Sequence, residues 1–69
     1  MREEERLREL LQKMASSSVG ERIEFEGVII EREPWCYKIT GNRGMRRIGL
    51  QLTERSVKLA LRFVKEGRL

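Results

Sequence analysis

The fold is decided by residues 21–52, ERIEFEGVIIEREPWCYKITGNRGMRRIGLQL, where apolar and polar side chains alternate along much of the stretch. Alternation with a period of two is typical of β-strands that bury one face. Gly27 interrupts the first run, and a glycine inside a strand often marks a bulge. Pro34 ends the run because proline has no amide hydrogen to donate to a ladder. We therefore expect one long, bulged strand over residues 21–33.

Two further strands are predicted after Pro34. Residues 35–40 form the second, with Trp35 and its alternate neighbours on the face that we expect to pack in the core. GNRG at 41–44 is a strong turn signal, because glycine and asparagine adopt the positive φ angles of tight hairpins. Residues 45–52 form the third strand, whose leucines continue its apolar face. The three strands make an antiparallel meander.

One helix is predicted before the three strands in the sequence, and another after them. Residues 1–16 carry an apolar stripe with the i, i+3, i+4, i+7 spacing of an amphipathic helix, formed by Leu7, Leu10, Leu11 and Met14. Residues 17–20 are a short linker of small residues. Residues 53–67 form the second helix, with Thr53 as N-cap and Gly67 as its C-terminal glycine. The prediction is a single α+β domain over residues 1–69, in the order α-β-β-β-α, with both helices packed on one face.

The composition excludes several classes of chemistry. The chain has 69 residues, 39% hydrophobic and 38% charged, with no histidine, no aspartate and one cysteine. Zinc clusters, histidine-based catalysis, catalytic triads and disulfide scaffolds all need residues that are missing. We therefore expect no enzyme, no catalytic or metal-binding residues and no cofactor. We also expect no membrane span or secretory signal and, from the lone cysteine, a cytoplasmic location.

The charge is divided unevenly along the chain, although its formal net value is only +4. Residues 1–34 carry six basic groups against nine glutamates, a net charge of −3, whereas residues 35–69 carry nine against two, a net charge of +7. Such asymmetry favours a polyanionic partner. The alternative is a protein whose two halves pair their charges.

Cations recur in the C-terminal half at two places. One is a stripe along the second helix, and the other is the turn with the start of the third strand. Together they are the predicted nucleic-acid-binding residues: Arg43, Arg46, Arg47, Arg55, Lys58, Arg62 and Lys65. Their spacing suits phosphate contacts, although a helix can also carry such a stripe only as a solvated face.

The second helix also carries an apolar pair, Leu59 and Phe63, that we expect on the side opposite the sheet. This pair needs a cover, either the leucine stripe of the first helix or the same surface of another subunit. Leu59, Phe63, Leu7 and Leu11 are therefore the predicted partner interface.

One set of positions in the strands and the second helix follows a known pattern: Gly27-Val28, Pro34-Trp35-Cys36-Tyr37-Lys38-Ile39, Asn42-Arg43-Gly44, Arg47-Ile48-Gly49, Thr53, Val57 and Ala60. With these residues the chain resembles the DNA-binding domains of plant ethylene-response factors and the arm-binding domains of phage integrases, which place one helix against a three-stranded sheet. In that family the exposed sheet face enters the major groove of DNA. The resemblance implies that the contacts come from Arg32, Trp35, Lys38, Arg43 and Arg47.

The whole-chain order is similar instead to that of the double-stranded-RNA-binding domain. That family sets a lysine cluster at the start of its last helix to span phosphates. Arg55 and Lys58 fall near those positions.

The function predicted first is a small, non-enzymatic protein that binds DNA or RNA, mainly through phosphates. A protein-interaction or self-assembling module is the alternative, either a homodimer or a small regulator of a larger complex. An engineered scaffold without natural function is a third possibility.

Overall fold

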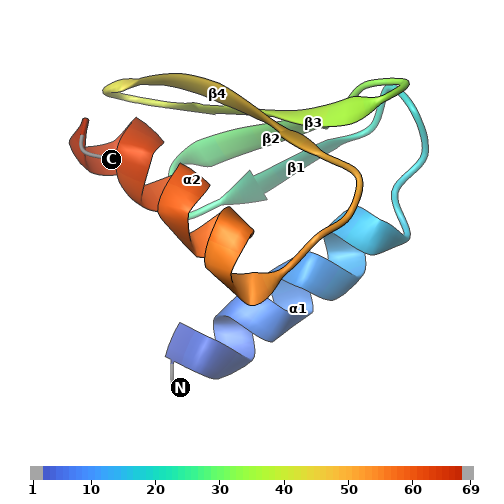
Figure 1. Cartoon of the computed structure of the whole chain (residues 1–69), viewed down its shortest axis with the longest axis horizontal. Helices are drawn as coiled ribbons and strands as arrows, with labels where there is room; N and C mark the ends of the chain where they lie inside the picture. Colours follow the sequence, from blue (N-terminus) through green and yellow to red (C-terminus); the bar gives the residue numbers. More distant parts are fainter. Residues whose placement is uncertain (1–2, 68–69) are drawn as a thin grey trace.

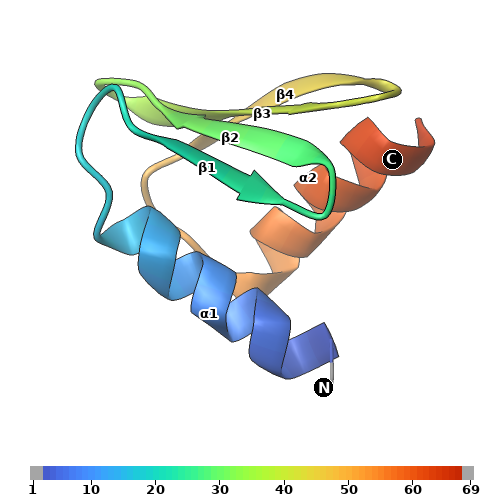
Figure 2. The ribbon, with the colours of Figure 1, turned by 180° about the vertical axis from the view of Figure 1, so that it is seen from behind.

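The computed structural model describes residues 3–67 and has the predicted α+β architecture. The elements, in chain order, are α1 (Glu3–Ala15), β1 (Arg22–Phe25), β2 (Val28–Arg32), β3 (Cys36–Gly41), β4 (Gly44–Gly49) and α2 (Glu54–Glu66). The strands form one antiparallel sheet in sequence order, and both helices cover the same face of it (Figures 1 and 2). The predicted class and the placement of both helices are confirmed. The predicted helix start at residues 1–2 lies outside the described residues.

The sheet has four strands, so the prediction of three was wrong. The expected bulge at Gly27 is a two-residue turn in which Glu26 has φ 51° and Gly27 has φ 81°. Two successive left-handed residues match the right-handed twist of the flanking strands, and they pair Phe25 directly with Val28. The long first strand is therefore the hairpin β1–β2.

The connection between β2 and β3 corrects the prediction for Trp35. The amide of Glu33 donates a hydrogen bond to the carbonyl of Cys36 at 2.9 Å, which leaves Pro34 and Trp35 as the two turn residues. Trp35 lies outside the strand alternation and its side chain is 85% exposed, not packed in the core. The third predicted strand was also too long, because β4 ends at Gly49.

The core lies between the sheet and the two helices. It consists of Leu10, Met14, Val28, Ile30, Tyr37, Ile39, Val57, Ala60, Leu61 and Val64. The one hydroxyl in this cluster has a partner, because Tyr37 Oη donates to the carbonyl of Met14 at 2.8 Å. Thr53 and Ser56 form a capping box at the start of α2, as the N-cap prediction required.

The last turns of α2 touch the β3–β4 turn through backbone atoms. The amide of Arg43 donates to the carbonyl of Val64 at 2.8 Å. A Cβ atom at Gly41 would lie only 2.6 Å from that same carbonyl oxygen. Glycine at position 41 is therefore a condition for this approach, since any other side chain would push the helix away from the sheet.

We expect Gly41→Ala to lower the free energy of unfolding by about 1–3 kcal/mol, because the added methyl overpacks a backbone contact. Urea denaturation monitored by circular dichroism measures the change. Gly49→Ala is the matched control: a Cβ atom there meets nothing within 4 Å, so its effect should stay within about 0.5 kcal/mol. Equal stabilities for the two variants would contradict the close approach.

Candidate nucleic-acid interface

The exposed side chains of α2 fall into three groups around the helix axis, one opposite the buried face and one on each flank. At about 100° per residue, one ridge points away from the core and carries exposed side chains only. We call this the outer ridge; it comprises Arg55, Leu59, Arg62 and Glu66. Lys58 and Lys65 lie on the flank toward the β1–β2 turn and α1, and Phe63 lies on the opposite flank, toward β4.

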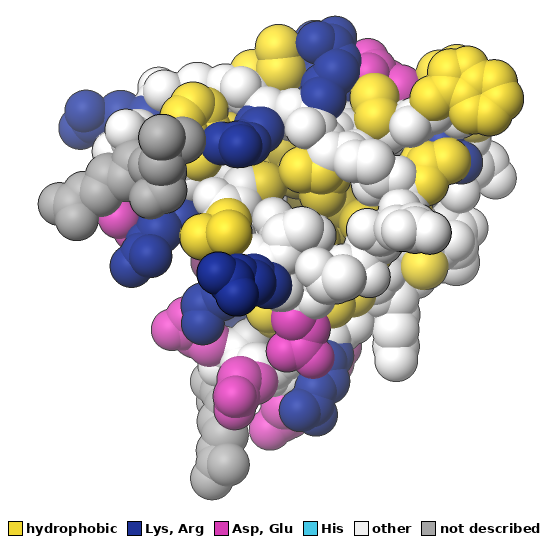
Figure 3. Space-filling model, in the orientation of Figure 1, with side chains coloured by type: hydrophobic (Ala, Val, Ile, Leu, Met, Phe, Trp, Pro, Cys, Tyr) yellow, Lys and Arg dark blue, Asp and Glu magenta, His cyan; other side chains and the backbone are white. Residues whose placement is uncertain are grey.

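The β3–β4 hairpin adds two arginines beside α2. The Arg46 guanidinium lies over the Phe63 ring, 5.1 Å from its centroid, and Arg43 lies in the turn, where its own amide donates to the Val64 carbonyl. Phe63 is therefore covered by this hairpin, and its predicted position opposite the sheet was wrong. Figure 3 views the molecule from the side in which α2 and β4 are in sight, and basic and hydrophobic side chains alternate there.

Leu59 is the exposed member of the apolar pair, at 43%. Leu7 and Leu11 of the first helix are partly buried and pack against the core of their own chain, as does Phe63. Of the four predicted interface residues, only Leu59 is therefore largely available to a partner.

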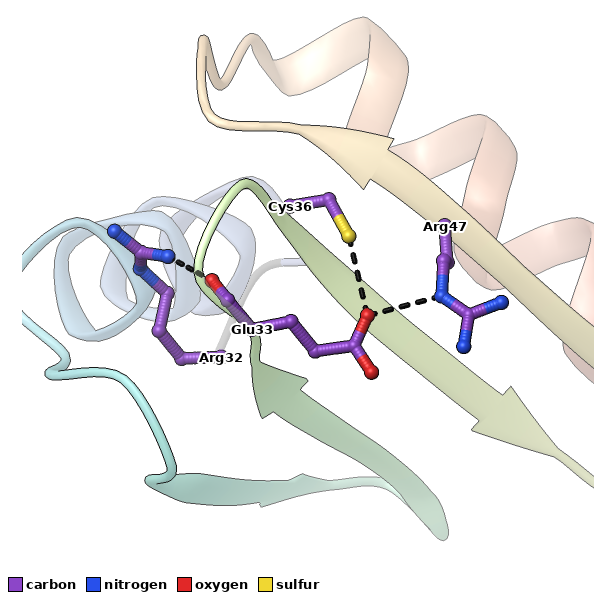
Figure 4. Close-up of polar contacts among 4 residues, drawn as sticks. All are labelled: Arg32, Glu33, Cys36 and Arg47. Atoms are coloured by element: carbon purple, nitrogen blue, oxygen red, sulfur yellow. Dashed lines mark hydrogen bonds and ion pairs between the residues drawn. The ribbon is translucent and has the colours of Figure 1, made fainter.

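Arg47 lies apart from the other hairpin arginines. It pairs in register with Lys38 on the sheet face that no helix covers, and its Nε lies 2.9 Å from Glu33 Oε1 (Figure 4). The same oxygen accepts from Cys36 Sγ at 3.2 Å, and the Arg32 guanidinium donates to the Glu33 carbonyl. The hydrogen bond from Arg47 lowers the pKa of Glu33. The adjacent carboxylate raises the pKa of Cys36, which disfavours a reactive thiolate.

Lys65 is also engaged, at a junction of three elements. Its Nζ lies 2.6 Å from Glu26 Oε1, and Arg6 Nη1 of α1 lies 2.6 Å from Glu26 Oε2. Both cations lie over the Phe25 ring, Arg6 at 5.5 Å and Lys65 at 5.9 Å from the centroid. The hydrogen bond from Lys65 is the largest cause that lowers the pKa of Glu26. Lys65 thus connects α2 to the β1–β2 turn.

A groove of about 420 Å³ separates α2 from the first turns of α1. Lys58 lines it on the α2 side together with the four residues of the outer ridge, whereas Glu3 and Glu4 line it on the α1 side. Within residues 3–67, no ion pair across this groove joins the α2 stripe to those glutamates. Five of the seven predicted cations have no ion-pair partner in this described part of the chain: Arg43, Arg46, Arg55, Lys58 and Arg62.

Sequence reasoning did not find the role of Glu26 as a bridge. Its partners are Arg6, twenty residues earlier, and Lys65, 39 residues later, so no local spacing indicates them. The only available signal for the turn that positions Glu26 was Gly27 between two strand-like runs, because Glu-Gly is not one of the residue pairs typical of two-residue hairpin turns.

No protein-family model, curated protein or solved structure matches the chain. Between residues 3 and 67, no helix is long and apolar enough to cross a bilayer. The same residues contain no group of three cysteine or acidic side chains that could hold a metal ion.

We expect Glu26→Gln to lower the urea midpoint at pH 7, because Arg6 and Lys65 lose their carboxylate. The pKa of Glu26 is lowered on folding from its ordinary value of 4.5, so its stabilisation is present above that value. This stabilisation is lost as the pH falls through the lowered pKa of the folded state. Urea titrations from pH 7 down to acid should therefore show the variant converging on the native protein.

Glu24→Gln is the control, since Glu24 is exposed and makes no ion pair among the described residues. A deficit of Glu26→Gln that stays constant across this pH range would contradict the ion-pair account.

Proposed function

We propose that this chain is a non-enzymatic protein that binds nucleic acid through a basic surface formed by Arg43, Arg46, Arg55, Lys58 and Arg62. The observation that supports the proposal is that the hairpin with Arg43 and Arg46 lies against the last turns of α2, and that all five cations have no ion-pair partner in the described part of the chain. Cations without an ion-pair partner gain the most binding free energy from contact with phosphates, since each neutralised phosphate releases condensed counterions. Binding is mainly to the backbone and weakens steeply with salt.

Arg47 and Lys65 are left out of the proposed surface. Each donates a hydrogen bond to a glutamate, so a phosphate would have to compete with a carboxylate already in contact. Arg47 also lies on the sheet face opposite α2.

Of the five cations in the proposed surface, Arg46 is the one whose side chain is already held in place to bind a phosphate. Its stacking on Phe63 restricts the side chain before any ligand arrives, which reduces the entropy lost on binding. The planar guanidinium can then donate two parallel hydrogen bonds to one phosphate.

We expect the double substitution Arg46→Gln and Lys58→Gln to weaken binding to duplex nucleic acid and to flatten its salt dependence. Each lost phosphate contact reduces the slope of log K against log salt by about 0.9 on B-form DNA. Fluorescence anisotropy at several salt concentrations measures both quantities. Arg47→Gln is the matched control and should leave the slope unchanged. If Arg47→Gln weakened binding as much as the double variant, the proposed surface would be in the wrong place.

A second candidate function is protein interaction, and a different observation favours it. Three exposed apolar side chains lie at the end of the sheet away from the β3–β4 turn: Val19 at 58%, Trp35 at 85% and Leu50 at 40%. The bond from the Gly20 amide to the Arg32 carbonyl, at 2.7 Å, and the pairing of Cys36 with Gly49 bring their loops to this end. We call this the Trp35 end. Exposed apolar clusters, and tryptophan above all, are typical of protein interfaces.

If the Trp35 end binds a second copy, sedimentation equilibrium should give a mass that rises with concentration, and Trp35→Glu should restore the monomer. A native protein that stays monomeric at every concentration would contradict self-assembly.

We also propose a cytoplasmic location for the protein, where Cys36 would stay reduced.

A further inference from the structure

The outer ridge of α2 carries a leucine in the middle of its charges. Leu59 is 43% exposed and lies between two arginines on the ridge. Counted from Arg55, Leu59 is at position i+4 and Arg62 at position i+7. Contacts to phosphates alone give no reason for an apolar side chain at the centre of a basic surface. Contacts to base edges give such a reason, because thymine presents an apolar methyl group in the major groove.

We infer that the outer ridge enters the major groove of duplex DNA, which makes double-stranded DNA the ligand class of the proposed surface. This inference rests on the proposed function. A helix with its side chains is about 10–12 Å across, close to the 12 Å width of that groove. From Arg55 to Arg62 the ridge spans about 10.5 Å along the axis, which is the rise of about three base pairs.

Both sides of α2 offer a place for a phosphate strand. On the β4 side, Arg43 and Arg46 lie beside the last turns of the helix. On the other side, the 420 Å³ groove, which the outer ridge also lines, leaves open space next to Lys58. A helix in the major groove is flanked by both phosphate backbones, so cations are needed on both flanks, and α2 has them.

The far wall of that groove limits the affinity. Glu3 and Glu4 line it and repel a phosphate strand that approaches Lys58. Glu66, at the C-terminal end of the outer ridge, is acidic as well, although a carboxylate in the major groove can accept from the amino group of cytosine.

The chemistry of the ridge favours DNA over RNA. Arg55 and Arg62 can donate two hydrogen bonds to a guanine, and Leu59 can contact a thymine methyl. RNA carries uracil, which has no such methyl, and the major groove of A-form RNA is too narrow for side chains to read.

Fluorescence anisotropy with three 16-base-pair duplexes tests this inference. They are thymine-rich DNA, the same DNA with deoxyuridine in place of thymine, and RNA of the same sequence. The native protein should bind the thymine DNA at least about tenfold more tightly than the RNA. It should bind the thymine DNA about fourfold more tightly than the deoxyuridine DNA, the effect of one buried methyl group.

Leu59→Ala should abolish the thymine-over-deoxyuridine preference, and the control Leu50→Ala, which removes a similarly exposed leucine at the Trp35 end, should keep it. Thermal melting by circular dichroism verifies that both variants fold. Equal binding of DNA and RNA, or no methyl preference, overturns the inference and leaves the proposed function standing. Binding to none of the duplexes at low salt overturns both. If Leu59→Ala lost the same binding affinity on all three duplexes, Leu59 would not act by contacting a thymine methyl, and this result would also overturn the inference.

Discussion

The backbone contact between α2 and the β3–β4 turn is the constraint on which the rest of the structure depends. It consists of the Arg43 amide on the Val64 carbonyl and of the empty space at Gly41 that admits this carbonyl. Since the contact joins backbones, its geometry does not depend on side-chain rotamers. It fixes which end of the helix the hairpin meets, and so it brings Arg46 onto Phe63. A basic surface made of two distant segments follows from this approach.

The two interpretations of the charge asymmetry each describe part of the molecule. Glutamates of the N-terminal half do neutralise two cations of the C-terminal half, Glu26 at Lys65 and Glu33 at Arg47. These pairs also have structural roles, because the first joins α2 to the β1–β2 turn and the second joins Arg47 of β4 to the segment after β2. Surface pairs of this kind contribute little stability each, because water and salt screen the attraction between exposed charges. Among the described residues of the C-terminal half, the cations left over are Lys38 on the uncovered sheet face and the five beside and along α2. These five form the surface that we propose for a polyanion.

The two helices could be predicted because their signals are local. Apolar spacing and the Thr53 cap act within a few residues, and the structure reproduces them. The predicted number of strands was wrong because a glycine between two strand-like runs fits a bulge as well as a turn, and glutamate rarely adopts the φ of 51° found at Glu26. Trp35 was misplaced because alternation holds only while the strand continues, and the turn begins at Glu33.

The partition of the hairpin arginines could not be read from the sequence either. Arg46 and Arg47 are neighbours, so they point to opposite faces of β4, but which face meets α2 is decided by pairing with the buried Ile39.

An amide-resolved NMR titration with a DNA duplex tests the central claim most directly. The account predicts shift changes that grow together in residues 43–46 and 55–62 and leave the uncovered sheet face around Lys38 unchanged. Changes confined to that sheet face, or to the Trp35 end, would contradict it.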